Sequence, residues 1–183
     1  MEKRPHYGSD IIKIAITGPE STGKSTLSAQ LAKKYNTLWV PEYAREYISE
    51  KEGNYEESDL LHIANQQYAN EQLFVKDANK ILFCDTEMLV IKIWSMVKYE
   101  RCHPEIIQKL KTQNFSHYLL CDIDILWQED PLREHPHFRE QLFSMYEQEL
   151  KHYNFPYTII QGDGDERLNL AVNTINLLTD LRH

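Results

Sequence analysis

Near its N-terminus the chain contains Gly18-Pro19-Glu20-Ser21-Thr22-Gly23-Lys24-Ser25, with Thr26 next. Two glycines around four residues, followed by Lys and a hydroxyl residue, match the phosphate-binding loop of nucleotide-binding proteins. An apolar run at 11–16 precedes the loop, and a helical pattern follows it. In a strand–loop–helix unit, the glycines let backbone N–H groups turn inward around an anion, and the helix adds its positive end. We therefore expect Gly18 and the segment from Glu20 to Thr26 to bind ATP, with Lys24 at the terminal phosphates and Ser25 on Mg²⁺.

Length and charge limit the class of protein. At 183 residues the chain suits one domain, and we expect a polar leader at 1–10 and a single domain at 11–183. A formal net charge of -8 argues against a nucleic-acid partner, because phosphate backbones need a basic footprint. Residues 1–10 lack a signal-peptide core, and no apolar run approaches membrane-spanning length. The three cysteines lack metal-type spacing and suit a reducing compartment, so the expected location is cytoplasmic.

Short apolar runs alternate with helical patterns along the chain. The expected strands are 11–16, 37–40, 81–84, 118–121 and 157–160, and the expected helices are the segment from the loop to 35, then 43–49, 58–75, 88–99, 104–110, 137–153 and 167–181. This alternation predicts a three-layer α/β/α fold with a five-stranded parallel sheet. Together with the phosphate-binding loop it is typical of a P-loop NTPase of small-kinase architecture. Ligands bind beyond the carboxyl ends of such strands, so the polar residues there should face one crevice. Those residues are Gly18, Glu42, Asp85, and Asp122 with Asp124.

Asp85 directly follows the apolar run Ile81-Leu82-Phe83-Cys84. Mg²⁺ beside a triphosphate needs few protein ligands, so Asp85 and Ser25 could hold it. Asp85 could instead be the general base that takes a proton from an acceptor hydroxyl, or it could cap the helix that follows. The placement beside the phosphates favours a functional role.

A second polar group follows the expected strand 37–40, in Pro41-Glu42-Tyr43-Ala44-Arg45-Glu46. Glu42 could orient a sugar hydroxyl of a phosphate acceptor, and Arg45 could bind a phosphate. A surface pair of Glu42 and Arg45 at a helix start explains the spacing equally well.

Residues 124–136 are polar, contain proline and lack periodicity, which predicts a loop, and the position after a strand end favours a lid. Arg133 could reach a transferring phosphate when the lid closes, and Trp127 could stack on a flat ring. Burial of Trp127 and solvation of Arg133 are the alternatives. Gly162, in the turn after the last expected strand, could let backbone approach the adenine, although a plain turn explains it as well.

Several of these motifs together resemble the ribosylnicotinamide kinase domain of NadR-type NAD biosynthesis proteins, a P-loop kinase family. The resemblance rests on the loop from Gly18 to Leu27, the segment Val40 to Glu46, Cys84-Asp85-Thr86, and the spacing of Asp124, Trp127, Asp130 and Arg133. It runs from about residue 11 to the C-terminus. Two departures are Leu126, where proline is expected before Trp127, and the missing regulatory and adenylyltransferase parts, which would make this a standalone kinase domain.

The resemblance implies ATP- and Mg²⁺-dependent phosphorylation of the ribose 5′-hydroxyl of nicotinamide riboside, giving nicotinamide mononucleotide and ADP. It also implies that Glu42, Tyr43 and Arg45 lie in the nucleoside pocket with Asp85 and Asp124, that Trp127 contacts the nicotinamide or closes over it, and that Arg133 is the lid arginine. A kinase for a different small nucleoside and a non-catalytic nucleotide-binding switch are the alternatives. The sequence leaves open whether Glu42 or Asp85 is the base, whether ATP or GTP is preferred, and the oligomeric state.

Overall fold

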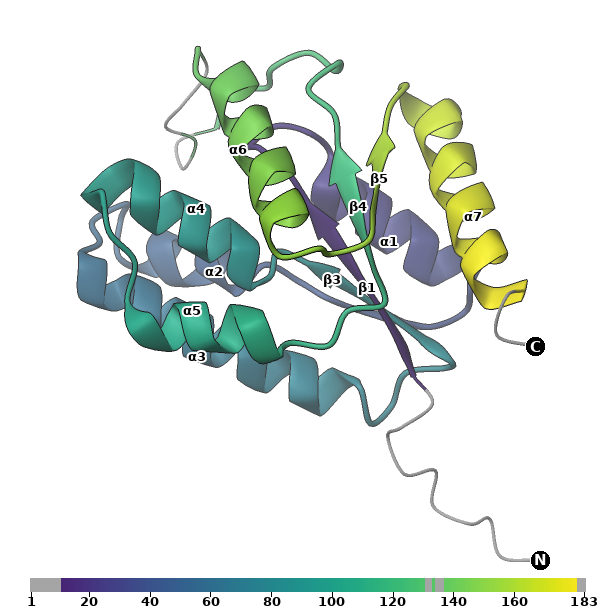
Figure 1. The fold of residues 1–183 in the computed structure, drawn as a ribbon, viewed down its shortest axis with the longest axis horizontal. Coiled ribbons are helices and arrows are strands. Elements are labelled where there is room, and N and C mark those ends of the chain that lie inside the picture. The colour runs from purple at the N-terminus through teal and green to yellow at the C-terminus, as the bar shows by residue number, and fades with distance from the viewer. Residues whose placement is uncertain (1–10, 131–132, 134–136, 181–183) are drawn as a thin grey trace, which may run out of the picture.

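The computed structural model describes residues 11–130, 133 and 137–180. The expected leader at 1–10 and part of the expected lid therefore lie outside the described residues. The ribbon in Figure 1 is a twisted sheet with helices on both of its faces. The expected α/β fold of the P-loop class is confirmed by this architecture.

The sheet has five parallel strands in the order β2-β3-β1-β4-β5. In chain order they are β1 (Ile12–Thr17), β2 (Leu38–Val40), β3 (Ile81–Asp85), β4 (His117–Cys121) and β5 (Tyr157–Ile160). Strand β1 lies in the middle, so the loop that follows it opens between β3 and β4. The chain reverses its direction of winding at β1, and open α/β sheets bind ligands at such a switch point.

Seven helices cover the sheet in the described part of the chain. Helices α1 (Lys24–Lys34) and α7 (Gly164–Asp180) pack on one face, and α2 (Tyr43–Glu50), α3 (Glu57–Phe74), α4 (Met88–Tyr99), α5 (Pro104–Thr112) and α6 (Arg139–His152) pack on the other (Figure 1). Alternation along β1 produces these two layers, because successive side chains of a strand point to opposite faces. Ile14 and Ile16 join the core under α1 and α7, whereas Ala15 joins the core under the other helices.

Expected and observed element ends differ by at most three residues, and those of β5 and α4 coincide. The largest difference is α7, which begins at Gly164 rather than at Arg167. The Asp163 side chain accepts a hydrogen bond from the Gly164 N–H at 2.7 Å, and its carbonyl accepts one from Glu166 at 3.1 Å. These bonds start the helix inside the segment that the sequence predicts to be a turn, because Asp at a helix start offers its oxygens to the first free N–H groups.

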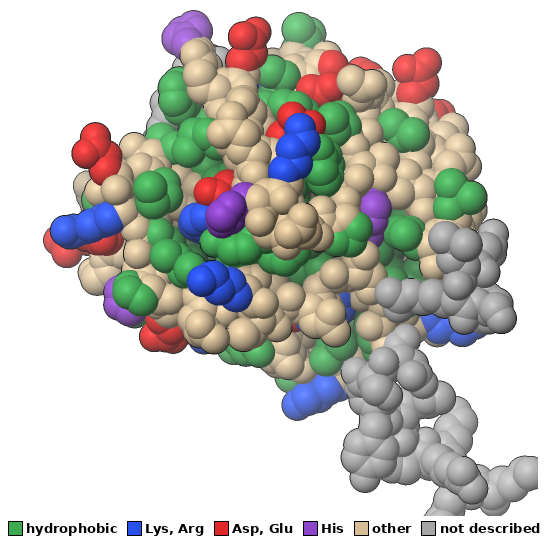
Figure 2. Space-filling view, in the orientation of Figure 1, with side chains coloured by type: hydrophobic (Ala, Val, Ile, Leu, Met, Phe, Trp, Pro, Cys, Tyr) green, Lys and Arg blue, Asp and Glu red, His purple; other side chains and the backbone are tan. Residues whose placement is uncertain are grey.

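Charged side chains on the face seen in Figure 2 are scattered, and Lys and Arg do not gather into one patch there. Among the described helices, none combines the length and the apolar composition that a membrane crossing requires.

Candidate active site

The loop between β1 and α1 needs glycine at two positions. Gly18 has a φ of 130°, and a Cβ at this position would lie 2.8 Å from the carbonyl oxygen of Cys121 on β4. Gly23 has a φ of 76° and is the N-cap residue of α1, with no capping bond from a described side chain. The first N–H groups of α1 are therefore left free beside the cavity, as an anion site at a helix N-terminus requires.

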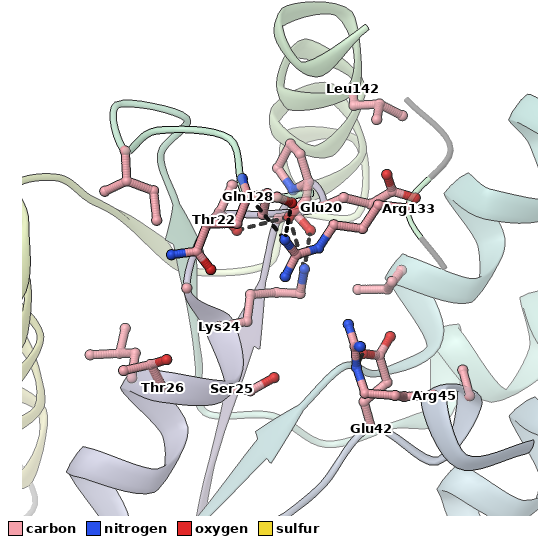
Figure 3. A pocket seen from close by; sticks show the side chains of 18 of the residues that line it. Glu20, Thr22, Lys24, Ser25, Thr26, Glu42, Arg45, Gln128, Arg133 and Leu142 are labelled. Carbon is pink, nitrogen blue, oxygen red and sulfur yellow. Dashed lines mark hydrogen bonds and ion pairs between the residues drawn. The ribbon is translucent and has the colours of Figure 1, made fainter. Parts of the chain in front are cut away.

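Three cations line the cavity around this loop, namely Lys24, Arg133 and Arg167. The Lys24 ammonium donates to the carbonyl oxygens of Gly18 at 3.0 Å and Pro19 at 2.8 Å, so it lies across the loop. Lys24 and Arg133 approach one another over the loop in Figure 3. All eight expected loop residues line the same cavity, from Gly18 and Glu20 through Thr26.

Asp85 ends β3 and meets the start of α1. Its Oδ2 accepts a hydrogen bond from the Ser25 hydroxyl at 2.5 Å, and its side chain is 1% exposed. Its Oδ1 has no hydrogen-bond partner within the described residues. Burial, and next the nearby Glu42 carboxylate, raise the pKa of Asp85 to about 6, while Lys24 lowers it. A buried carboxylate with a free oxygen beside a serine hydroxyl fits Mg²⁺, which binds few protein oxygens and keeps several waters.

The helix cap at the end of β3 belongs to Glu87, not to Asp85. The Glu87 carboxylate accepts from the Leu89 N–H at 2.5 Å, from the Thr17 hydroxyl at 3.0 Å and from Gln113 at 3.1 Å. Burial raises the pKa of Glu87 to about 7. The alternative that Asp85 caps the following helix is therefore wrong, and Asp85 is free for another role.

The cavity continues from the loop to a second end with different chemistry. Its volume is about 390 Å³, and Glu42 and Arg45 lie across it from the loop (Figure 3). The Glu42 side chain is 26% exposed, and its Oε2 lies 3.9 Å from Arg45 Nε. Arg45 also binds Asp130 of the segment after β4 at 2.7 Å. The placement expected for Glu42 and Arg45 at this strand end agrees with these contacts.

Apolar side chains that the sequence analysis did not single out form the wall of this second end. Tyr55 and Trp94 contact each other edge to face with ring centroids 4.9 Å apart, and the Trp94 indole N–H donates to the Tyr55 hydroxyl at 2.8 Å. Val90, Ile93 and Val97 of α4 line the cavity beside them. The sequence does contain a feature that could have identified this wall. Helix α4 is apolar almost all round, so one side is buried in the core and the other lines the cavity.

The segment after β4 is docked on the loop through Ser21. The Ser21 hydroxyl accepts from the Gln128 N–H at 2.8 Å and from Arg133 at 3.3 Å. The Ser21 carbonyl accepts from Arg139, the first residue of α6, at 3.0 Å. Burial, and then the nearby charge of Arg167, lower the pKa of Arg139. The expected lid therefore contacts the loop, and Arg139 is a contact that the sequence analysis missed.

Five of the expected site residues do not line the cavity, namely Tyr43, Asp85, Asp124, Trp127 and Gly162. Tyr43 turns toward α3, with its hydroxyl 3.3 Å from His62. The guanidinium groups of Arg133 and Arg139 each lie 5.9 Å from the centroid of the Trp127 ring, so the ring packs against the lid and the start of α6. Asp124 accepts from the Gly162 N–H at 2.7 Å and pairs with Arg167. These side chains bond to other parts of the protein, and the ligand contacts expected of them stay predictions.

Arg167 explains why Asp124 and Gly162 lie together. Arg167 is 5% exposed, and its guanidinium donates to the carbonyl oxygens of Gly162 at 2.8 Å and Thr22 at 3.0 Å. This arginine therefore joins the start of α7 to the phosphate-binding loop. It lines the cavity with Asp163 and Gly164, whereas Gly162 does not.

Comparison with known proteins gives three findings. The family model AAA_28, described as an AAA domain, matches residues 13–167. The trifunctional NAD biosynthesis/regulator protein NadR of Salmonella typhimurium is 34% identical over 127 residues, which cover 66% of this chain and 30% of that protein. NadR of Escherichia coli has the same identity and coverage. The chain thus matches less than a third of the length of these relatives.

Two solved structures share the fold. The NadR protein in complex with NR superposes with a TM-score of 0.82 at 21% identity and covers 94% of this chain and 52% of that one. Deoxyadenosine kinase from M. mycoides has a TM-score of 0.65 at 18% identity and covers 90% of this chain and 99% of that one. The resemblance to NadR that the motifs indicate is confirmed, and the fold is that of the P-loop kinases.

Proposed function

The chain belongs to the AAA_28 family, and from this premise we propose that it is a kinase that transfers the terminal phosphate of ATP to a small nucleoside. The observation that carries the proposal is one cavity with two chemically different ends. One end is the phosphate-binding loop with its three cations, and the other has a carboxylate and an arginine beside aromatic and aliphatic walls. A donor and an acceptor bound in one such cavity would face each other, which is the main requirement of phosphoryl transfer.

The loop end suits ATP. Lys24, Arg133 and Arg167 neutralise charge on the phosphates, and the free N–H groups of α1 hold them in place. Ser25 and Asp85 would hold Mg²⁺, which supplies further charge neutralisation on the phosphates. Because the lid residues Gln128 and Arg133 contact Ser21 in the loop, a bound nucleotide would be shielded from water.

The two carboxylates take different roles in this proposal. Asp85 is bound to Ser25 and is buried below the cavity, whereas Glu42 lines the cavity at the acceptor end. Glu42 is therefore the general base that takes the proton of the acceptor hydroxyl, and Asp85 is the metal ligand. The flat aromatic walls of Tyr55 and Trp94 suit an aromatic base, and nicotinamide riboside is the first candidate because the relatives are NAD biosynthesis proteins and one solved NadR binds NR.

The test is purified protein with ATP, Mg²⁺ and a panel of ribonucleosides and deoxyribonucleosides. ADP formation that depends on a ribonucleoside, with the largest kcat/KM for nicotinamide riboside, is the expected result. ADP formation that no acceptor accelerates would reject the kinase, and tight ATP binding without transfer would point to a nucleotide switch. Turnover of deoxyribonucleosides alone would keep the kinase and reject the substrate. Glu42→Gln should retain ADP affinity and lose about 10²- to 10⁴-fold in kcat, the usual contribution of a general base.

A further inference from the structure

Gln67 is a buried glutamine in the middle of α3, and it bonds to two loops of the candidate active site. Its side chain is 3% exposed, although its neighbours on the inner side of the helix, Ile63 and Ala64, are apolar. Its Oε1 accepts from the Tyr43 N–H at 2.9 Å. Its Nε2 donates to carbonyl oxygens of Pro41, Asp85 and Thr86, at 3.2, 3.3 and 3.1 Å. One amide therefore connects α3 to the chain after β2 and to the chain after β3.

Each of these loops carries one of the two carboxylates. Pro41 and Tyr43 flank Glu42, and Asp85 with Thr86 ends β3. Tyr43 is the first residue of α2, and the first N–H groups of a helix have no partner within the helix. Gln67 supplies that partner from α3. The Glu42 side chain, which makes no capping bond to a described residue of α2, is thus available to the cavity.

The second loop has a conformation that needs outside support. Thr86 has a φ of 72°, in the left-handed region that a β-branched residue rarely adopts. Such a conformation is strained and persists where its surroundings hold it in place. The Thr86 N–H donates to the Ile16 carbonyl at 3.3 Å, and the Thr86 carbonyl accepts from Gln67. Gln67 therefore helps to hold the turn that aims Asp85 at Ser25.

We propose that Gln67 is a positioning residue that fixes the Glu42 loop relative to the Asp85 loop, and with it the acceptor end of the cavity relative to the donor end. The functional part of this inference rests on the proposed kinase activity. A glutamine suits the task because one flat amide offers both a donor and an acceptor at the right separation. Leaving a buried amide without its hydrogen bonds costs free energy, so the Gln67 amide favours the one arrangement of the two loops that keeps all of its bonds.

The geometric part can be tested without any turnover. Gln67→Met keeps the length of the side chain and removes all four hydrogen bonds, and Gln67→Glu keeps the acceptor for Tyr43 but removes the donor. Gln66→Met is the matched control, since Gln66 lies next to Gln67 on α3 and donates to Asn70 of the same helix at 2.9 Å. Hydrogen–deuterium exchange of the amides at 42–44 and 85–88 is compared among the folded proteins. Both segments should exchange faster in Gln67→Met and remain as in the wild type in Gln66→Met.

The functional part is read from kinetics on the same variants. Gln67→Met should lower kcat about 10- to 100-fold, the loss typical of a small misplacement of reacting groups. The affinity for Mg²⁺-free ADP should not change, because the loop contacts of Lys24 do not involve Gln67. If Gln67→Met does not fold, the same kcat and ADP affinity are measured on Gln67→Glu.

Unchanged exchange in both segments, or an equal change in Gln66→Met, would overturn the inference. Faster exchange together with wild-type kcat would overturn its functional part alone. If the wild type transfers phosphate to no nucleoside, the proposed function fails, and the exchange experiment still decides whether Gln67 holds the two loops.

Discussion

Replacing Trp94 by Ala should weaken acceptor binding and leave ATP binding intact. Trp94 lies on the cavity side of α4, against Tyr55, whereas the phosphate-binding loop is at the other end of the cavity. Stacking of a base on an aromatic side chain is worth about 1–3 kcal/mol by alanine substitution. The KM for the nucleoside should therefore rise about 5- to 150-fold, since each 1.4 kcal/mol is a factor of ten.

A second substitution separates the ring from its hydrogen bond. Trp94→Phe keeps an aromatic wall but removes the N–H that donates to the Tyr55 hydroxyl at 2.8 Å. This hydrogen bond lies within the protein and is present with or without the nucleoside, so the acceptor KM should rise less than in Trp94→Ala. Initial rates at saturating ATP with varied nucleoside measure the KM, and calorimetric titration with ADP measures the affinity of the loop end separately.

Trp127→Ala is the matched control, because the motifs alone assign the base contact to Trp127. In the structure the Trp127 ring contacts Arg133 and Arg139, so its loss should lower kcat through the lid and leave the acceptor KM near the wild-type value. The reasoning is refuted if Trp127→Ala raises the acceptor KM while Trp94→Ala does not. Thermal unfolding of each variant checks that the protein is folded before kinetics are compared.

Three further outcomes are expected. Lys24→Ala should abolish transfer in a coupled ADP assay, because the transferring phosphate loses its fixed cation, and measurable turnover would contradict the assigned role. Gly18→Ala should lower both the melting temperature and ATP affinity, since its Cβ would meet the Cys121 carbonyl at 2.8 Å, whereas Gly53→Ala, which meets nothing within 4 Å, should cost less. Burial raises the pKa of Glu87 from 4.5 to about 7, so the unfolded chain releases this proton first and the stability contributed by Glu87 falls as pH rises from about 4.5 to 7. In urea unfolding, the free energy of unfolding of Glu87→Gln should rise by a few kcal/mol relative to that of the wild type between about pH 5 and 8. An identical pH dependence in the two proteins would reject this linkage.

Much of the fold and the donor end of the site could be predicted from the sequence. The loop from Gly18 to Ser25 is a contiguous stretch, so its residue types are enough to predict its backbone conformation. Runs such as Ile81 to Cys84 are apolar over the length of a buried strand, and their order along the chain leaves few topologies. The contacts of the arginines that join the loop to the helices could not be predicted in this way. Arg139 and Arg167 stand at helix starts, where sequence patterns do not distinguish a buried guanidinium from a solvated one.

The acceptor end depends on how the helices are rotated against the sheet. Ile91 is buried in the core, whereas Val90 and Trp94 line the cavity, yet all three belong to one apolar helix pattern. Tyr43 belongs to the motif that the resemblance assigns to the nucleoside, but the start of α2 turns it toward α3.

By itself, the sequence determined that the chain forms a parallel α/β sheet with a phosphate-binding loop after its first strand, because these features are encoded by neighbouring residues. Only the tertiary structure decided that the walls opposite the loop are Tyr55 and Trp94, that Arg167 joins the loop to α7, and that Gln67 connects the loops of Glu42 and Asp85. Those contacts join residues far apart in the chain, and they arise from the packing of helices on the sheet, which local patterns do not specify.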